Sequence, residues 1–144
     1  NRTMKKVLSF DFIPTIIEPL ELDALEDQEY NIDIAPHITD CDHKPEQLSF
    51  SLIPAEKQGR NITLDGTNLR IKYSLPIVSD TISINISDGI RTTQMDIPVK
   101  IEPVNDPPTV KKVDTIHPTE DIPFAISLEE YFSDEDDALE DLTI

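Results

Sequence analysis

The feature that most constrains the fold is an alternation of apolar and polar residues with a period of two. From Thr81 to Ser87 every second residue is isoleucine, and the run from Met95 to Ile101 alternates in the same way. Successive side chains of a β-strand point to opposite faces, so each run predicts a strand with one buried face. Asp88-Gly89 lies between the runs and predicts the tight turn of a hairpin.

Five further short runs have the composition and alternation of strands, and they bring the expected number of strands to about seven. They lie at 15–18, 30–34, 48–52, 61–64 and 69–73. Strands at a spacing of roughly ten residues, with turn signals between them, are typical of a β-sandwich. We therefore predict an all-β fold, an antiparallel seven-stranded sandwich. Pro98 further predicts that the last strand lies at a sheet edge at that position.

Charge and residue content argue against several classes of function. The chain has 29 Asp and Glu against 12 Lys and Arg, a net charge of −17, which is unfavourable for binding nucleic acid or anionic lipid. The single cysteine, Cys41, excludes an internal disulfide, and the three glycines lie too far apart for a phosphate-binding loop. No stretch has the roughly 20 apolar residues that cross a membrane. We predict no enzyme, no catalytic or cofactor-binding residues, no nucleic-acid partner and no membrane insertion in this segment.

The sequence is also similar to itself at an offset of 94 residues, with no gap. The matched positions are Glu26-Asp27 with Glu120-Asp121, Asp40 and Asp42 with Asp134 and Asp136, and Pro14-Thr15 with Pro108-Thr109. This pattern predicts three parts. Residues 1–10 would be the tail of a preceding module or a linker, 11–104 a complete module, and 105–144 a linker and the first part of the next, incomplete module.

The repeated Asp-x-Asp pairs are candidate ligands for a hard cation. Calcium takes about six to eight oxygen atoms, and two carboxylates of a loop can supply some of them. A solvated acidic surface is the alternative interpretation. An EF-hand is excluded, because Ala138 and Leu139 stand where a loop that begins at Asp134 requires a ligand and a glycine. His43 is interpreted as a surface-loop residue, because no second histidine stands at a spacing useful for a transition metal.

The segment Val104–Pro108, Val-Asn-Asp-Pro-Pro, followed by Glu120-Asp121 and Ser133–Asp136, resembles a known family. It is similar to the cadherin-like tandem repeats, of about 95 residues each, found in large bacterial surface proteins and adhesins. The resemblance covers residues 11–144. It implies Ig/cadherin-like β-sandwich modules joined end to end, with calcium at the junctions making an extended extracellular stalk rigid.

The resemblance also implies which residues would bind calcium. At the junction after the complete module they would be Glu26, Asp88, Asn105, Asp106, Asp134 and Asp136. Asp40 and Asp42 would serve an earlier junction, to which the preceding segment could contribute only Asp11. The expected location is extracellular, at the cell surface. The expected partners are neighbouring modules of the same chain and another protein chain that adds a strand to the incomplete module.

Two other functions stay open at this point. One is a β-sandwich module that binds a sugar or peptide, although the absence of Trp and the presence of only three Tyr disfavour stacking on sugars. The other is a cadherin-like ectodomain of a eukaryotic surface protein. The Asn-x-Ser/Thr sequences at Asn1, Asn61 and Asn85 are compatible with that second function.

Overall fold

The computed structural model describes residues 11–54, 57–127 and 129–142. The predicted tail of a preceding module, residues 1–10, lies outside this range. The chain forms two compact units, which divide between Pro103 and Val104. None of the helices in the described ranges is long and apolar enough to span a membrane.

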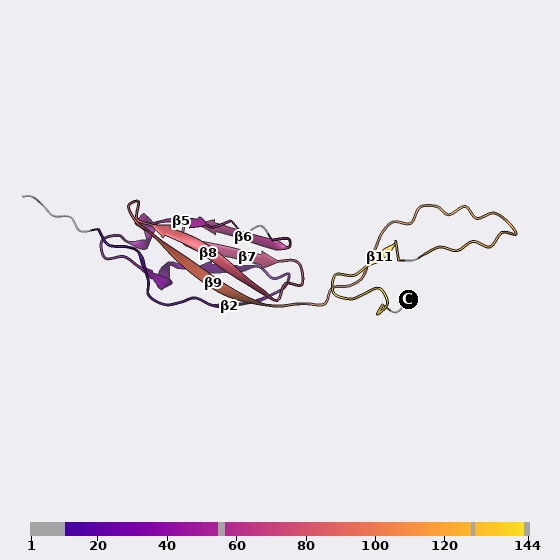
Figure 1. The fold of residues 1–144 in the computed structure, drawn as a ribbon, viewed down its shortest axis with the longest axis horizontal. Helices are drawn as coiled ribbons and strands as arrows, with labels where there is room; N and C mark the ends of the chain where they lie inside the picture. The colour runs from indigo at the N-terminus through magenta and orange to yellow at the C-terminus, as the bar shows by residue number, and fades with distance from the viewer. Residues whose placement is uncertain (1–10, 55–56, 128, 143–144) are drawn as a thin grey trace, which may run out of the picture. The chain divides into compact units, whose positions relative to one another are not determined.

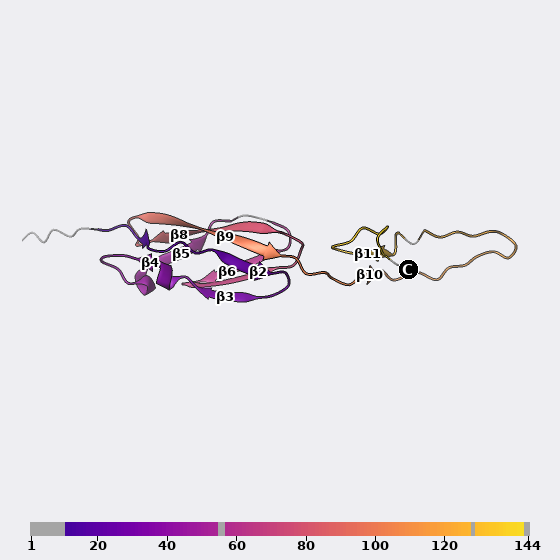
Figure 2. The ribbon, with the colours of Figure 1, turned by 90° about the horizontal axis from the view of Figure 1, so that it is seen from below.

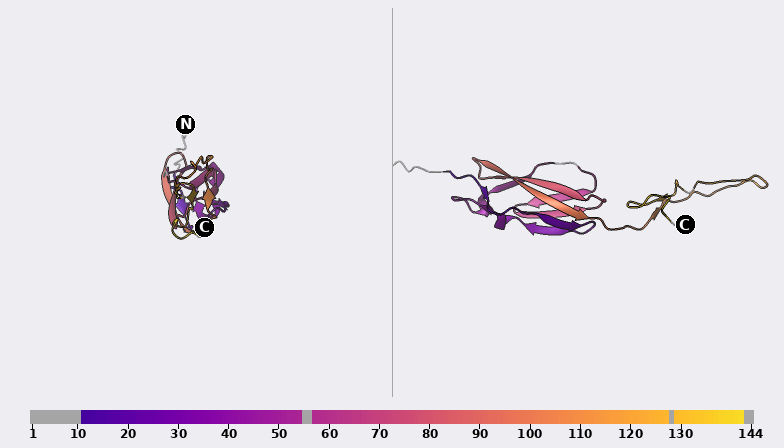
Figure 3. Two further views of the ribbon diagram at one scale, coloured as in Figure 1. Left: turned by 90° about the vertical axis from the view of Figure 1, so that its right-hand side faces the viewer. Right: turned by 60° about the horizontal axis from the view of Figure 1, so that its bottom comes forward.

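The first unit is a sandwich of two sheets, and the predicted all-β sandwich is confirmed (Figures 1 and 2). The larger sheet has the strand order β2-β9-β8-β5, with β2 at Leu22–Leu25, β9 at Thr92–Glu102, β8 at Ser79–Ser87 and β5 at Ser49–Leu52. The smaller sheet has the order β3-β7-β6, with β3 at Tyr30–Asp33, β7 at Asn68–Tyr73 and β6 at Arg60–Asp65. The right-hand view of Figure 3 shows the salmon and orange β8–β9 pair on one side of the unit and the violet β3 on the other.

Short elements complete the first unit. A two-stranded ribbon joins β1 (Thr15–Ile16) to β4 (Ile38–Thr39). The 3-10 helices η1 (Ala35–His37) and η2 (Pro45–Gln47) lie on either side of β4 in the sequence, and each has a proline in its first turn. Proline fits there because the first turn of a helix leaves its N–H groups without intrahelical partners.

The predicted β8–β9 hairpin is present, and β6 and β7 form a second hairpin. The β6–β7 hairpin turns at Gly66 and the β8–β9 hairpin at Gly89, whose φ angles are 56° and 97°. Positive φ is a conformation that glycine adopts without steric cost, which explains why these two glycines mark the turns. The β8–β9 hairpin carries the site described below, because Asp88 immediately precedes Gly89.

One strand pair differs from the prediction of a purely antiparallel sandwich. The strand β2, which the period-two pattern did not single out, pairs with β9 in parallel, with Leu22 opposite Val99. The preceding segment already lies beside the start of β9, because the Thr93 hydroxyl donates to the Pro14 carbonyl. Since β2 and β9 run in the same direction, the chain enters this unit at one end and leaves it at the other.

Pro98 was expected at a sheet edge, and it does lack a partner strand on one side, although β9 as a whole is not an edge strand. β9 lies between β2 and β8 and is therefore an interior strand. Its registered pairing with β2 begins at Val99, one residue after Pro98, whereas Pro98 is in register with Thr81 of β8. A residue without an N–H is tolerated best where no partner strand needs that donor.

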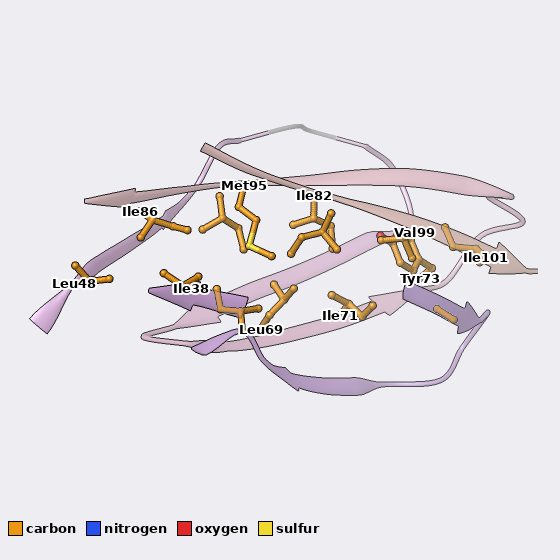
Figure 4. Packing of buried hydrophobic residues seen from close by; sticks show 14 residues of the cluster. Ile38, Leu48, Leu69, Ile71, Tyr73, Ile82, Ile86, Met95, Val99 and Ile101 are labelled. Carbon is orange, nitrogen blue, oxygen red and sulfur yellow. The ribbon is translucent and has the colours of Figure 1, made fainter. Parts of the chain in front are cut away.

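The core lies between the two sheets and is built from alternate residues of three long strands. Figure 4 shows these side chains pointing from both layers into the space between them. The fully enclosed members, each 2% exposed or less, include Ile82, Ile84, Ile86, Met95, Ile97, Val99, Ile101, Leu69, Ile71 and Tyr73. Burial of a side chain of this size stabilises the fold by about 1.5–3 kcal/mol, so this face of β7, β8 and β9 is the main apolar contribution.

One carboxylate lies at the edge of this core. The Asp80 side chain is 0% exposed and accepts a hydrogen bond from the Tyr73 hydroxyl at 2.9 Å. Lys57 Nζ lies 2.5 Å from one of its oxygens and Arg60 Nε 2.7 Å from the other. Burial alone would raise the pKa of Asp80, but the hydrogen bonds from Lys57 and Tyr73 and the charge of Arg60 hold it below its usual value.

The second unit repeats local structure of the first. Its strands β10 (Thr109–Val110) and β11 (Phe132–Ser133) pair with Thr109 opposite Ser133, and β1 and β4 pair with Thr15 opposite Thr39. Thr109 and Ser133 stand 94 positions after Thr15 and Thr39, respectively. The backbone bonds that follow, Ile17 N–H to His37 O and Lys111 N–H to Tyr131 O, recur at the same offset. The 94-residue similarity in sequence therefore corresponds to the same local backbone structure.

Candidate metal centre

The first acidic group lies directly after β4 and is organised by a turn. Asp40 Oδ1 accepts the backbone N–H groups of Asp42 at 2.9 Å and His43 at 3.1 Å. Asp side chains commonly close such turns by bonding the backbone two or three residues on. Because Oδ1 is fixed by these two bonds, the other oxygen, Oδ2, is held in one direction.

The Asp40 carboxylate is buried, and only one of its two oxygen atoms accepts hydrogen bonds. Its side chain is 0% exposed, and Oδ2 accepts no hydrogen bond. Oxygen atoms of Asp40 and Asp42 and a ring nitrogen of His43 all lie within 4.8 Å of one another. A buried carboxylate oxygen without a donor is costly, and a bound cation removes that cost.

The two carboxylates of this group perturb each other. The close side chain of Asp42 lowers the pKa of Asp40, and Asp40 in turn raises the pKa of Asp42. Two carboxylates at short distance repel each other when both are charged, unless a counter-charge lies between them. A divalent cation can supply that counter-charge.

Asp88 and Asp11 lie at the same end of the unit. Asp88 Oδ1 accepts the N–H groups of Ile90 at 2.6 Å and Arg91 at 2.7 Å, and its buried Oδ2 accepts none. The backbone bonds from Arg91 and Ile90 lower the pKa of Asp88, and the nearby charge of Asp40 also acts on it. Asp11 is ion-paired with Arg91 at 3.1 Å. From the sequence, Asp11 is the only expected ligand that the preceding segment contributes to this end, and Asp88 is expected at the other junction.

The expected grouping of Asp88 with Glu26 is wrong. Glu26 follows β2, and its backbone N–H donates to Glu102 O at the end of β9, whereas Asp88 precedes the start of β9. The 11 residues of β9 separate the two positions by about 30 Å, since a strand rises about 3.3 Å per residue. The hairpin turn carries Asp88 to the end where Asp40 lies. The expected grouping of Glu26 with the linker residues stays a prediction.

The second unit contains a matching acidic group. Asp134 Oδ1 accepts the N–H groups of Asp136 at 2.9 Å and Asp137 at 3.0 Å, and Asp134 Oδ2 is buried without a hydrogen-bond partner. Asp136 Oδ2 accepts the N–H of Asp106 at 2.6 Å. The structure thus brings three predicted ligands together, with Asn105 beside them as the residue that precedes Asp106.

The two groups share the same turn and the same buried carboxylate oxygen. In the first unit the backbone of Phe12 acts to lower the pKa of Asp42, and Phe12 stands 94 residues before Asp106. The side chains at the two positions differ, Phe12 against Asp106, so residue types alone did not indicate this equivalence. The group that the two positions have in common is the backbone N–H. In both groups the Oδ2 atom of the first aspartate, Asp40 or Asp134, is buried and accepts no hydrogen bond. Both groups can offer several oxygen atoms to a hard cation.

Comparisons with known proteins bear on the fold. Neither protein families nor curated proteins give a match to the sequence. Among solved structures, extracellular cadherin domains 1–5 of protocadherin gamma B2 match with a TM-score of 0.52 and 23% identity, over 78% of this chain and 24% of that one. Domains 1–4 of protocadherin gamma B7 match with a TM-score of 0.53 and 17% identity, over 78% of this chain and 30% of that one.

An endo-fucoidan hydrolase of glycoside hydrolase family 107 matches with a TM-score of 0.51 and 17% identity, over 65% of this chain and 14% of that one. The chain therefore spans less than a third of each of these structures. At such identities the likeness establishes the fold, which is a cadherin-like β-sandwich.

Proposed function

We propose that this chain is a structural module of an extracellular, repetitive adhesion protein, and that calcium binds at its repeated acidic groups. The observation that carries the proposal is the buried Oδ2 of Asp40 and of Asp134, which accepts no hydrogen bond in either group. The same kind of turn holds both carboxylates. Two equivalent groups 94 residues apart fit a device used once per module. A catalytic pair would have no reason to recur in this way, and the proposed role includes no catalytic step.

The fold supports the rest of the proposal. The protocadherins that share it are described as arrays of extracellular cadherin domains. In the first unit the chain enters at one end and leaves at the other, which suits modules joined in line. Calcium would neutralise carboxylates that otherwise repel one another, and would thereby favour one fixed arrangement of neighbouring modules. Pro107-Pro108 would stiffen the linker in addition. The array would be the element that holds an adhesive tip away from a cell surface, as in the large bacterial surface proteins that the linker resembles. The partners would be neighbouring modules and, at the second unit, a strand of another chain.

The test is a calcium titration of the full chain, with melting temperature and small-angle scattering in calcium and in chelator. Calcium at a hundredfold excess over Kd should stabilise the folded state by about 2.7 kcal/mol. Asp40→Asn and Asp134→Asn should each remove binding at one group. Asp96→Asn is the matched control, because Asp96 is exposed and already accepts hydrogen bonds from Ser83 and Gln94. Melting and scattering curves that are the same in calcium and chelator would overturn the proposal.

A further inference from the structure

The loops of the two acidic groups differ at two positions, and the difference at the fourth residue changes the ligand chemistry of the group. The first reads Asp40-Cys41-Asp42-His43 and the second Asp134-Glu135-Asp136-Asp137, so an imidazole stands where the second group has a carboxylate. Both residues at this position donate their backbone N–H to the first aspartate of the loop. His43 is therefore held in the group by the same turn as its acidic counterpart.

The His43 ring faces the carboxylates. Its Nδ1 lies 3.4 Å from Asp42 Oδ1 and 3.6 Å from Asp40 Oδ1. The same nitrogen is buried and makes no hydrogen bond. Three potential ligand atoms from three side chains therefore converge within 4.8 Å, one of them a nitrogen.

These distances match those around a small tetrahedral ion. Ligand atoms about 2.1 Å from a zinc ion stand about 3.4 Å from one another in a tetrahedron. Calcium takes oxygen ligands in larger number and at longer range, and gains little from an imidazole. Zinc and similar borderline cations bind imidazole and carboxylate together.

From this geometry we propose that the first unit binds a borderline divalent cation such as Zn²⁺ through Asp40, Asp42 and His43. The charge balances, because two carboxylates and a neutral imidazole neutralise one divalent ion. The fully buried Asp40 side chain, with its undonated Oδ2, is the second observation that points to a ligand. Cys41 is exposed and does not belong to the converging group, so its sulfur is not among the proposed ligands.

The inference rests on the proposed function in that it uses two of the same carboxylates. It goes further by assigning the two groups different ion preferences. The second group, with acidic residues at all four loop positions, would keep the preference for a hard cation. The first would accept Zn²⁺ in competition with Ca²⁺.

The test is a calorimetric titration of the full chain with Zn²⁺ and, separately, with Ca²⁺. Co²⁺ serves as a spectroscopic probe, since tetrahedral Co²⁺ with a nitrogen ligand absorbs in the visible range. The variant His43→Asp gives the first loop the acidic residue of the second. It should lower Zn²⁺ affinity at this site by more than about tenfold and abolish the Co²⁺ absorption, while Ca²⁺ binding is kept. His117→Gln is the control, because His117 is exposed and lies in the second unit.

The outcomes separate this inference from the proposed function. Ca²⁺ binding without a Zn²⁺ site that depends on His43 would overturn the inference and leave the proposed function standing. A Zn²⁺ site that depends on His43 without any Ca²⁺ binding would support the inference and overturn the calcium proposal. Equal Zn²⁺ affinity in the wild-type chain and His43→Asp would show that His43 is not a ligand of the ion, and would overturn the inference.

Discussion

Asp27 and Asp121 both have a left-handed backbone, with φ angles of 60° and 64°, and their positions differ by 94. Among the described residues they are the only non-glycine residues with positive φ. Aspartate tolerates this conformation better than most residues, because its short polar side chain can bond locally. The acidic dipeptide that marks the repeat in the sequence thus also marks a specific backbone shape.

The backbone at Asp27 gives the first prediction. The Asp27 N–H donates to Tyr73 O at 2.8 Å, so its conformation is fixed by a contact that any substitution must keep. Asp27→Gly should change the free energy of unfolding by less than about 1 kcal/mol, because glycine adopts positive φ freely. Asp27→Val should lower it by about 1–3 kcal/mol, because a β-branched residue is strained there. Urea unfolding of the two variants checks this, and equal stability of both would contradict it.

Gly59 gives a second prediction. Its φ is 73°, and a Cβ atom added there would lie 2.5 Å from a carbon of the Leu75 side chain. Gly59→Ala should therefore cost strain and a steric clash together, about 2–4 kcal/mol in unfolding free energy. Gly66→Ala is the control, with φ of 56° and nothing within 4 Å of the added carbon, and should cost about 1 kcal/mol. Thermal melting of both variants measures the difference. A smaller loss at Gly59 than at Gly66 would refute the proposed close packing.

The buried Asp80 predicts how stability depends on pH. Its pKa is lower in the folded state than in the unfolded chain, so the stability it contributes is present above the unfolded value, about 3.9. That contribution is lost as the pH falls through the folded value. Asp80→Asn should cost about 3 kcal/mol at pH 7, because it leaves the Lys57 and Arg60 charges without their partner.

Urea titrations at pH 7 and at pH 3 measure this effect. The deficit of Asp80→Asn should shrink at the lower pH, because the carboxylate of the unfolded wild-type chain is then becoming protonated and the folded state loses that advantage. Asp96→Asn serves for comparison, since the pKa of Asp96 is also lowered by Ser83 and Gln94 but the side chain is exposed. A deficit for Asp80→Asn that stays constant between the two pH values would rule out this role for the carboxylate.

The position of Asp88 at the same end of the unit as Asp40, close enough for their charges to interact, gives a fourth prediction. If both carboxylates bind one ion, Asp40→Asn and Asp88→Asn should each lower Ca²⁺ affinity, and the double variant should lose less than the sum of the two. Residues in one network show such coupling, by about 0.5–3 kcal/mol. The measurement is a double-mutant cycle by calorimetry. Asp40→Asn combined with Asp96→Asn provides the additive reference. Strict additivity of Asp40 and Asp88 would show that they bind separately.

The sequence alone determined the parts of this protein that depend on local pattern. Alternation over Thr81–Ser87 and Met95–Ile101 requires one buried face, and a glycine with positive φ closes the turn between them, so the β8–β9 hairpin was predictable. The Asp-x-Asp loops were predictable for a similar reason. The first aspartate of each loop accepts backbone N–H groups two and three residues on, which is a local contact.

Only the tertiary structure decided which distant groups meet. β2 spans four residues, too few to signal a parallel partner about 75 residues later, and its pairing with β9 is fixed by the shared core. The β8–β9 turn lies at the end of the unit where Asp40 lies, and it carries Asp88 there. The length of β9 separates Asp88 from Glu26. His43 became a candidate ligand only when its distances to two carboxylates were known. Local patterns follow from the bonding preferences of neighbouring residues, whereas these contacts depend on how two sheets pack, to which every strand of the unit contributes.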